Sequence, residues 1–165
     1  MLGWRVGLPV MAVDVGKGAL ATALPTLAGA DDPAWLPLAC AVAAVVGHVF
    51  PLFARFRGGK GVATGAGALL VLAPLAALGC AAIWGATVAV TRLVSLASVL
   101  AALALPAAVG LLGDAAPPGL LALAVGLALF VVWTHRSNLG RLLRGEEKPI
   151  TVGRAGEPPT GDARR

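Results

Sequence analysis

The sequence predicts an all-α fold, a polytopic bundle of transmembrane helices. Hydrophobic residues make up 58% of the 165 residues and charged residues only 13%, which is far more apolar than an ordinary soluble domain. The apolar residues occur in long runs, and most charges lie in the short stretches between those runs. Because each crossing needs roughly 20 residues, the chain has room for one bundle of about five or six spans and for no second large domain.

The expected elements follow from the apolar runs. These runs cover residues 7–27, 35–53, 62–91, 95–112 and 119–134. The first run contains Asp14 and Lys17 near its middle, which argues against a cleaved secretory signal and for a retained span. From residue 145 the chain is polar and rich in glycine, proline and charge. We therefore expect a transmembrane domain over residues 1–144 and a disordered cytoplasmic tail over residues 145–165.

The third run is expected to be broken near Pro74. Thirty residues is long for one span, and proline removes a backbone donor from the middle of a helix. A broken helix or a re-entrant pair returns the chain, so that the basic loop before residue 62, Arg92 and the basic tail lie on one face. Cytoplasmic loops are enriched in Lys and Arg, so this face is expected to be the cytoplasmic one.

A basic, glycine-rich loop separates the second and third runs. Its sequence is RFRGGKG, from Arg55 to Gly61. Glycines leave consecutive N–H groups free to turn toward one anion, and the cations supply the opposite charge. We expect phosphate to be bound here by Gly58, Gly59, Lys60 and Gly61. Topology alone also explains basic residues in a loop, but it requires no glycines. A nucleotide-binding P-loop is not indicated, because that motif needs Ser or Thr directly after the lysine.

A first polar stripe lies at the expected start of the fourth span. Arg92, Ser95 and Ser98 are spaced three residues apart, which aligns a cation with two hydroxyl groups. A helix N-terminus favours anions, so all three are candidate phosphate ligands. The alternative is a serine that caps the helix and an arginine that extends to the membrane surface.

A second stripe, with the same spacing, follows the last span. It consists of His135, Asn138 and Arg141. His135 can act as a general base or can hydrogen-bond a substrate oxygen, since neutral imidazole has both a donor and an acceptor. Anchoring of the chain at the membrane surface is the competing explanation.

Asp14 and Lys17 form a charged pair inside the first run. Their spacing places them on one side of a helix, and charges within a span normally face the protein interior. Either a structural ion pair or a polar cavity explains them. His48 lies in another apolar run and is expected to be an interior histidine with its hydrogen bonds satisfied. No spacing of Cys and His suggests a metal site.

The motifs, taken in order, resemble the bacterial PlsY family of glycerol-3-phosphate acyltransferases. They are DVGKG at 14–18, GHVFP at 47–51, FRGGKGVAT at 56–64, RLVSLAS at 92–98 and HRSNLGRL at 135–142. The resemblance implies acyl transfer from acyl phosphate to the 1-hydroxyl of glycerol 3-phosphate, giving lysophosphatidic acid and inorganic phosphate. No cofactor is expected, and the basic residues, which lie mainly in loops and the tail, do not suggest nucleic-acid binding. It also implies catalytic roles for His135 and Asn138 and a structural role for Glu146. The acyl-chain preference and the oligomeric state do not follow from it, nor does the identity of the general base, for which His135 and a phosphate oxygen of the substrate are the alternatives.

One departure from the family concerns the chain start. Family members begin with another span and a Ser/Gly/Asn-rich motif whose Ser and Arg are regarded as essential, and this sequence starts after that motif. We expect a true start further upstream; the alternative is an inactive fragment. A small anion transporter or channel is the competing functional class, because broken helices and the charged pair Asp14 and Lys17 also suit a substrate pathway.

Overall fold

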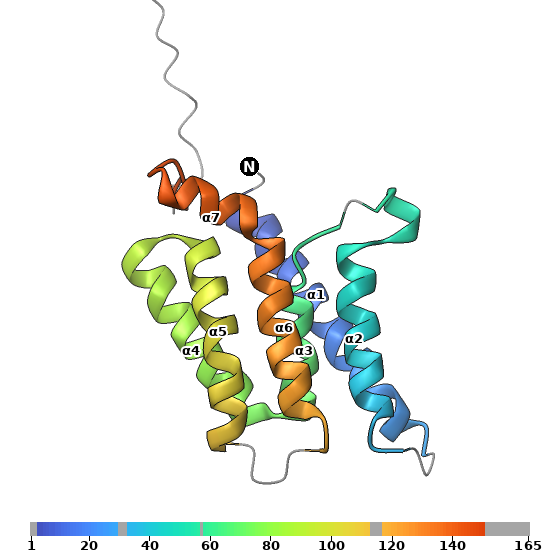
Figure 1. Cartoon of the computed structure of the whole chain (residues 1–165). Helices are drawn as coiled ribbons and strands as arrows, with labels where there is room; N and C mark the ends of the chain where they lie inside the picture. Colours follow the sequence, from blue (N-terminus) through green and yellow to red (C-terminus); the bar gives the residue numbers. More distant parts are fainter. Residues whose placement is uncertain (1–2, 30–32, 57, 113–116, 151–165) are drawn as a thin grey trace, which may run out of the picture.

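Helices form most of the part of the chain that the structure describes. The computed structural model describes residues 3–29, 33–56, 58–112 and 117–150, and no strand occurs in these ranges. The helices, shown in Figure 1, are α1 (Gly3–Leu27), α2 (Leu36–Val49), the 3-10 helix η1 (Leu52–Ala54), α3 (Val62–Leu72), α4 (Pro74–Thr91), α5 (Val94–Leu112), α6 (Leu120–Thr134) and α7 (Arg136–Leu143). The prediction of an all-α bundle is confirmed.

Several of these helices can cross a membrane. Within the described ranges, α1, α2, α4 and α5 supply four segments that are long and apolar enough, and α6 with α7, which are bent by 58° at their junction, make a fifth if the pair is taken as one broken span. Large apolar side chains also cover the outside of the bundle, as at Val90, which is 84% exposed, and Leu111, which is 79% exposed. Side chains exposed in this way are expected to contact lipid. The chain is therefore a multi-pass membrane protein.

The expected break lies at Pro74. Helix α3 ends at Leu72 and α4 begins at Pro74, with Ala73 in a non-helical conformation between them. Proline is tolerated in the first turn of a helix, where its missing N–H has no intrahelical partner. Figure 1 shows this break at one end of the bundle, whereas the loop before α3, the turn between α4 and α5, and helix α7 lie toward the other end. These three segments, which carry the candidate polar residues, therefore lie toward the same end of the bundle.

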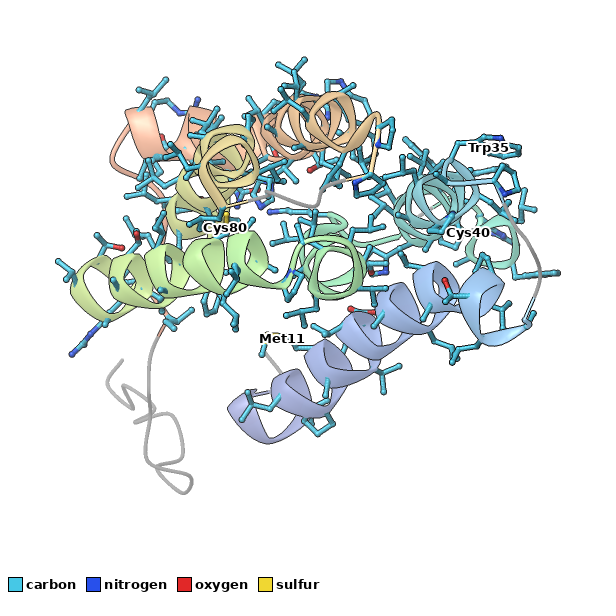
Figure 2. The ribbon with its side chains drawn as sticks, turned by 90° about the horizontal axis from the view of Figure 1, so that it is seen from below. Met11, Trp35, Cys40 and Cys80 are labelled. Carbon is cyan, nitrogen blue, oxygen red and sulfur yellow. The ribbon has the colours of Figure 1, made fainter. Side chains whose placement is uncertain are left out.

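Helix α1 packs closely against α3, as Figure 2 shows from below. A Cβ atom at Gly18 would clash with the backbone of Thr64, and one at Gly67 would clash with the backbone of Val15. Glycines therefore let the two helices approach at backbone distance, as is common between membrane helices. This packing fixes the start of α3, and with it the end of the glycine-rich loop.

Cys40 and Cys80 are free thiols on different helices, α2 and α4 (Figure 2).

The first residues after α7 are held against the bundle. Glu146 N donates to Arg141 O at 2.8 Å, and Ile150 N donates to Arg92 O at 2.8 Å. The expected disorder of the tail remains a prediction for residues 151–165, which lie outside the described ranges.

Candidate active site

A polar cavity of about 640 Å³ lies at the end of the bundle where the glycine-rich loop, α5 and α7 meet. Its wall combines side chains from α1, α2, α5, the α6–α7 junction and the segment after α7. The polar residues that line it are Asp14, His48, Lys60, Ser95, Ser98, His135, Asn138, Glu147 and Lys148. Segments distant in sequence therefore converge on one space.

The glycine-rich loop is fastened to the C-terminal end of α2. Gly58 N donates to Val49 O at 3.2 Å, and Gly59 N donates to His48 O at 3.3 Å. These two N–H groups are therefore not free for an anion, which corrects the expected reason for the glycines. The loop instead needs glycine for close approach, because a Cβ at Gly58 would meet the His48 carbonyl and one at Gly59 would meet the His48 ring. Gly61 has φ 82° and caps α3, a conformation that favours glycine.

Lys60 is the cation that this loop presents to the cavity. Its Nζ donates to Asn138 Oδ1 at 2.5 Å, and its carbonyl accepts a hydrogen bond of 3.2 Å from Thr134 Oγ1. Burial lowers the pKa of Lys60, and the negative charge of Glu147 opposes that shift. An ammonium that has lost part of its hydration gains more from an incoming anion than an exposed one does.

His135 lies at the bend between α6 and α7 and is only 2% exposed. Its Nδ1 is 2.8 Å from Val131 O. A carbonyl can only accept, so Nδ1 carries the proton in the neutral ring and Nε2 keeps its lone pair. Among the described residues Nε2 has no hydrogen-bond partner, and the residue lines the cavity. His135 can therefore accept a hydrogen bond or a proton from a bound hydroxyl group.

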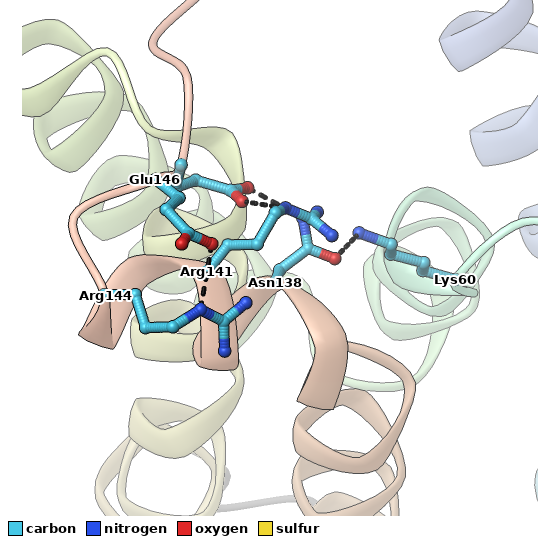
Figure 3. A network of polar contacts seen from close by, with 6 residues as sticks. Lys60, Asn138, Arg141, Arg144 and Glu146 are labelled. Atoms are coloured by element: carbon cyan, nitrogen blue, oxygen red, sulfur yellow. Dashed lines mark hydrogen bonds and ion pairs between the residues drawn. The ribbon is translucent and has the colours of Figure 1, made fainter.

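Glu147, which the sequence interpretation missed, connects Asn138 with Arg141. Asn138 Nδ2 donates to Glu147 Oε1 at 2.7 Å, and Arg141 Nε donates to Glu147 Oε2 at 2.8 Å (Figure 3). The hydrogen bond from Asn138 is the main reason that the pKa of Glu147 is lowered, and Ser95 and Arg141 add to the shift. The Asn138 amide is thus held with its oxygen toward Lys60.

Glu146, to which the structural role was assigned, points elsewhere. It forms an exposed ion pair of 2.8 Å with Arg144 and does not line the cavity. Gly145, with φ 70°, turns the chain after α7, and this turn brings Glu147 rather than Glu146 to the cavity. The acidic pair after Gly145 was the available signal, but the sequence does not say which member faces inward.

Ser95 and Ser98, the two serines of the stripe at α5, have different surroundings. Ser98 Oγ donates to Val94 O at 2.8 Å and accepts from Trp84 Nε1 at 3.2 Å, so its hydrogen bonds are satisfied within the bundle. Ser95 Oγ is buried beside the cavity; it lies near enough to Glu147 to lower the pKa of that carboxyl, but no partner among the described residues is within hydrogen-bonding distance. Ser95 is therefore the better placed ligand for a substrate oxygen.

Arg92 does not line the cavity. It ends α4 in a left-handed conformation, φ 58°, instead of starting α5, and its side chain is exposed. Its carbonyl accepts the hydrogen bond from Ile150 N. Arg57, in the basic loop, lies outside the described residues.

Asp14, Lys17 and His48 form a cluster next to the glycine-rich loop. Lys17 Nζ lies 2.5 Å from both Asp14 Oδ1 and His48 Nδ1. His48 therefore has a partner at Nδ1 but none at Nε2 among the described residues, and it lines the cavity together with Asp14, whereas an interior histidine with all its hydrogen bonds satisfied was expected. In the described ranges no group of three His, Cys, Asp or Glu residues is placed to hold a metal ion.

Comparison with known sequences gives one consistent result. Residues 1–145 match the family model described as glycerol-3-phosphate acyltransferase. Curated proteins of that name from Salinibacter ruber and Gloeobacter violaceus are 40% and 44% identical to this chain, over 92% and 90% of it and 73% of each relative. One from Synechococcus is 42% identical, over 90% of this chain and 72% of its own length.

Solved structures agree with the sequence comparison. The fold is similar to crystal structures of PlsY (YgiH), an integral membrane glycerol 3-phosphate acyltransferase. The glycerol 3-phosphate form has a TM-score of 0.80 and 32% identity, covering 91% of this chain and 74% of that one. The lysophosphatidic acid form has a TM-score of 0.78 and 31% identity, with 89% and 74% covered. On the family match, the relatives and the shared fold, this chain belongs to the PlsY family of integral membrane glycerol-3-phosphate acyltransferases.

Proposed function

We propose that this protein transfers an acyl group from acyl phosphate to the 1-hydroxyl of glycerol 3-phosphate, giving lysophosphatidic acid and inorganic phosphate. The observation that carries the proposal is the convergence of Lys60, His135 and Asn138 on one cavity of a membrane protein. The family match and the solved relatives with glycerol 3-phosphate and lysophosphatidic acid support the acceptor and the product.

The phosphate of glycerol 3-phosphate binds to Lys60, with Ser95 and Asn138 as hydrogen-bonding partners. Lys60 supplies positive charge, and Ser95 supplies a buried hydroxyl that lacks a partner among the described residues. A charged group bound in a partly desolvated site contributes more than one at the surface. Arg141 contributes indirectly, because it does not line the cavity and its Nε donates to Glu147.

Acyl phosphate is already an activated mixed anhydride, so no acyl-enzyme is needed. The 1-hydroxyl oxygen attacks the acyl carbonyl carbon, a new ester C–O bond forms, and the C–O bond to phosphate breaks with release of inorganic phosphate. The hydroxyl proton passes to Nε2 of His135, the ring nitrogen that keeps a lone pair when Nδ1 donates to Val131 O. Binding both anions in one orientation supplies the rest of the rate increase.

The acyl chain of the donor lies between α2 and α6. An apolar cavity of about 330 Å³ is found there, lined by Val42, Val45, Val46, Ala122, Leu123, Gly126, Leu127 and Phe130. Val45 and Phe130 also border Gly61, at the end of the glycine-rich loop. The apolar cavity therefore borders the end of the glycine-rich loop, which lines the polar cavity.

The active site faces the cytoplasm. Lys60, Arg92, Arg141, Arg144 and Lys148 all belong to segments near one end of the bundle, and such segments are enriched in basic residues on the cytoplasmic side. In bacteria this corresponds to the inner, or cell, membrane.

The test is product formation by the purified protein in detergent. Acyl phosphate with glycerol 3-phosphate should give equal amounts of lysophosphatidic acid and inorganic phosphate, whereas an acyl thioester donor should give neither. Uptake of glycerol 3-phosphate into protein-containing vesicles, without product, would overturn the proposal in favour of a transporter.

A further inference from the structure

His48 contacts the glycine-rich loop in two ways. Its carbonyl accepts the hydrogen bond from Gly59 N, at 3.3 Å, and its ring occupies the space beside Gly59 that a side chain would otherwise fill. The backbone contact belongs to any residue at this position, but the ring contact belongs to histidine. Lys60, the next residue, points into the cavity. A shift of the His48 ring therefore changes the space available to the residue that precedes the cavity lysine.

The ring of His48 is held from its other side by α1. Lys17 Nζ lies 2.5 Å from His48 Nδ1 and 2.5 Å from Asp14 Oδ1, while Nδ1 and Oδ1 are 3.5 Å apart. An ammonium group has only donors, so Nδ1 accepts and the ring proton lies on Nε2, the atom beside Gly59. Lys17 therefore sets both the orientation and the tautomer of the ring.

Helix α1, which carries Lys17, is held in place by close packing against α3. Gly18 and Gly67 bring α1 and α3 to backbone distance, and α3 starts directly after the loop. The loop is thus supported on one side by the α1–α3 packing and on the other by the His48 ring. Asp14 holds the Lys17 ammonium group in place, because the two residues lie three positions apart on the same helix and form an ion pair.

We propose that Asp14, Lys17 and His48 are positioning residues for the glycine-rich loop: Lys17, anchored by Asp14, orients the His48 ring, and the ring sets the position of Gly59 and hence of Lys60. None of the three needs to touch the phosphate. The proposal rests on the proposed function only in taking Lys60 as the phosphate ligand. Its consequence is that a residue on α1 controls affinity for glycerol 3-phosphate through the loop.

The experiment compares Lys17→Met, His48→Ala and their double variant with the wild type and with Arg144→Met. The last also removes one positive charge, from an exposed pair outside the cavity. Purified proteins are assayed for kcat and for KM of glycerol 3-phosphate, and their melting in detergent is recorded. Lys17→Met and His48→Ala should each raise KM about tenfold while kcat changes less. The double variant should resemble His48→Ala alone, because residues that act through one another are non-additive.

Two results would overturn the proposal. One is a wild-type KM in Lys17→Met; the other is a KM in the double variant equal to the product of the two single effects. If His48→Ala does not fold, Lys17→Met and the charge-neutral Asp14→Asn/Lys17→Met variant, which keep the ring, decide the question by the same KM criterion.

A failure of the proposed function is distinguishable from a failure of this inference. If the wild type forms no product, the dissociation constant for inorganic phosphate is measured instead in wild type, Lys17→Met and Arg144→Met. Weaker phosphate binding in Lys17→Met alone supports the positioning role, and equal binding in all three overturns it.

Discussion

Lys60 Nζ donates a hydrogen bond to Asn138 Oδ1, although the two residues are 78 positions apart in the sequence. The contact joins the glycine-rich loop to α7, and Glu147 holds the other end of the Asn138 amide. A bound phosphate would find the ammonium group of Lys60 already oriented.

Lys60→Ala should raise KM for glycerol 3-phosphate by about 10- to 100-fold, because a hydrogen bond to a charged group contributes roughly 1.5–3 kcal/mol. Steady-state kinetics with acyl phosphate held at saturation measure the change. Lys60→Arg, which keeps the charge, should raise this KM less than Lys60→Ala does. An unchanged KM in Lys60→Ala would remove this residue from the phosphate site.

The pKa of Lys60 predicts an alkaline limit to substrate binding. Burial lowers this pKa, so the charged form is lost at a lower pH than in a free lysine side chain. Since the charged form binds phosphate, KM for glycerol 3-phosphate should rise as the pH increases through the lowered pKa. In Lys60→Arg the guanidinium stays charged, and the rise should move to higher pH. Identical profiles for the two proteins would contradict the assignment.

His135→Gln should reduce kcat by about 10²-fold or more while KM for acyl phosphate changes little, because general-base catalysis contributes roughly 10²- to 10⁴-fold. Single-turnover measurements of product formation separate this effect from slow product release. Near-normal turnover with weaker affinity would instead assign the proton to a phosphate oxygen of the substrate and leave His135 as a ligand.

Glu147→Gln and Glu146→Gln form a matched pair with opposite expectations. Glu147→Gln should lower activity and the melting temperature, because the ion pair with Arg141 is lost and Asn138 then donates to a neutral amide oxygen instead of a carboxylate. Glu146→Gln should behave like wild type, since exposed ion pairs contribute about 0–1 kcal/mol. The reverse order of effects would show that the segment after α7 is placed differently.

The lowered pKa of Glu147 adds a pH signature to that comparison. A carboxylate whose folded-state pKa is depressed stabilises the fold above its unfolded pKa, and this contribution disappears as the pH falls through the folded value. Melting temperatures of wild type and Glu147→Gln should therefore converge in acid. A constant difference across that range would point to a packing effect.

Gly67→Ala tests the contact between α1 and α3. A Cβ at this position clashes with the backbone of Val15, so the melting temperature should fall clearly. Gly16→Ala is the matched control, since a Cβ there has nothing within 4 Å. Alanine is favoured over glycine in a helix by about 1 kcal/mol, so the control should be neutral or slightly stabilised. Equal loss in both variants would contradict the close packing.

Local chemistry explains which parts of the fold and site could be predicted from the sequence. The break at Pro74 follows from the missing N–H of proline, and the proximity of His135 to Asn138 follows from helical spacing. The charged loop with Lys60 was visible because its glycines and cations stand between apolar runs. These features depend on residues that are close in sequence.

The remaining features depend on tertiary placement. Glu147 and Glu146 are chemically equivalent neighbours, and only the turn at Gly145 decides which one reaches Asn138. The expected free N–H groups of Gly58 and Gly59 are bonded to α2 instead, because the loop folds back on that helix. The role of His48 required knowledge that α1 packs beside the loop. A local sequence pattern does not contain such contacts between residues that are distant in the sequence.

Helix α3 has 11 residues, about 16 Å of rise, which is half of a bilayer core of about 30 Å. A lysine at its leading end can therefore sit beneath the level of the lipid headgroups while remaining enclosed by protein. Under the proposed reaction, water-soluble glycerol 3-phosphate enters to this depth, and the acyl chain of the donor stays in the hydrocarbon core of the bilayer. Because α3 is short, the acyl chain does not have to be transferred into water for the reaction to occur.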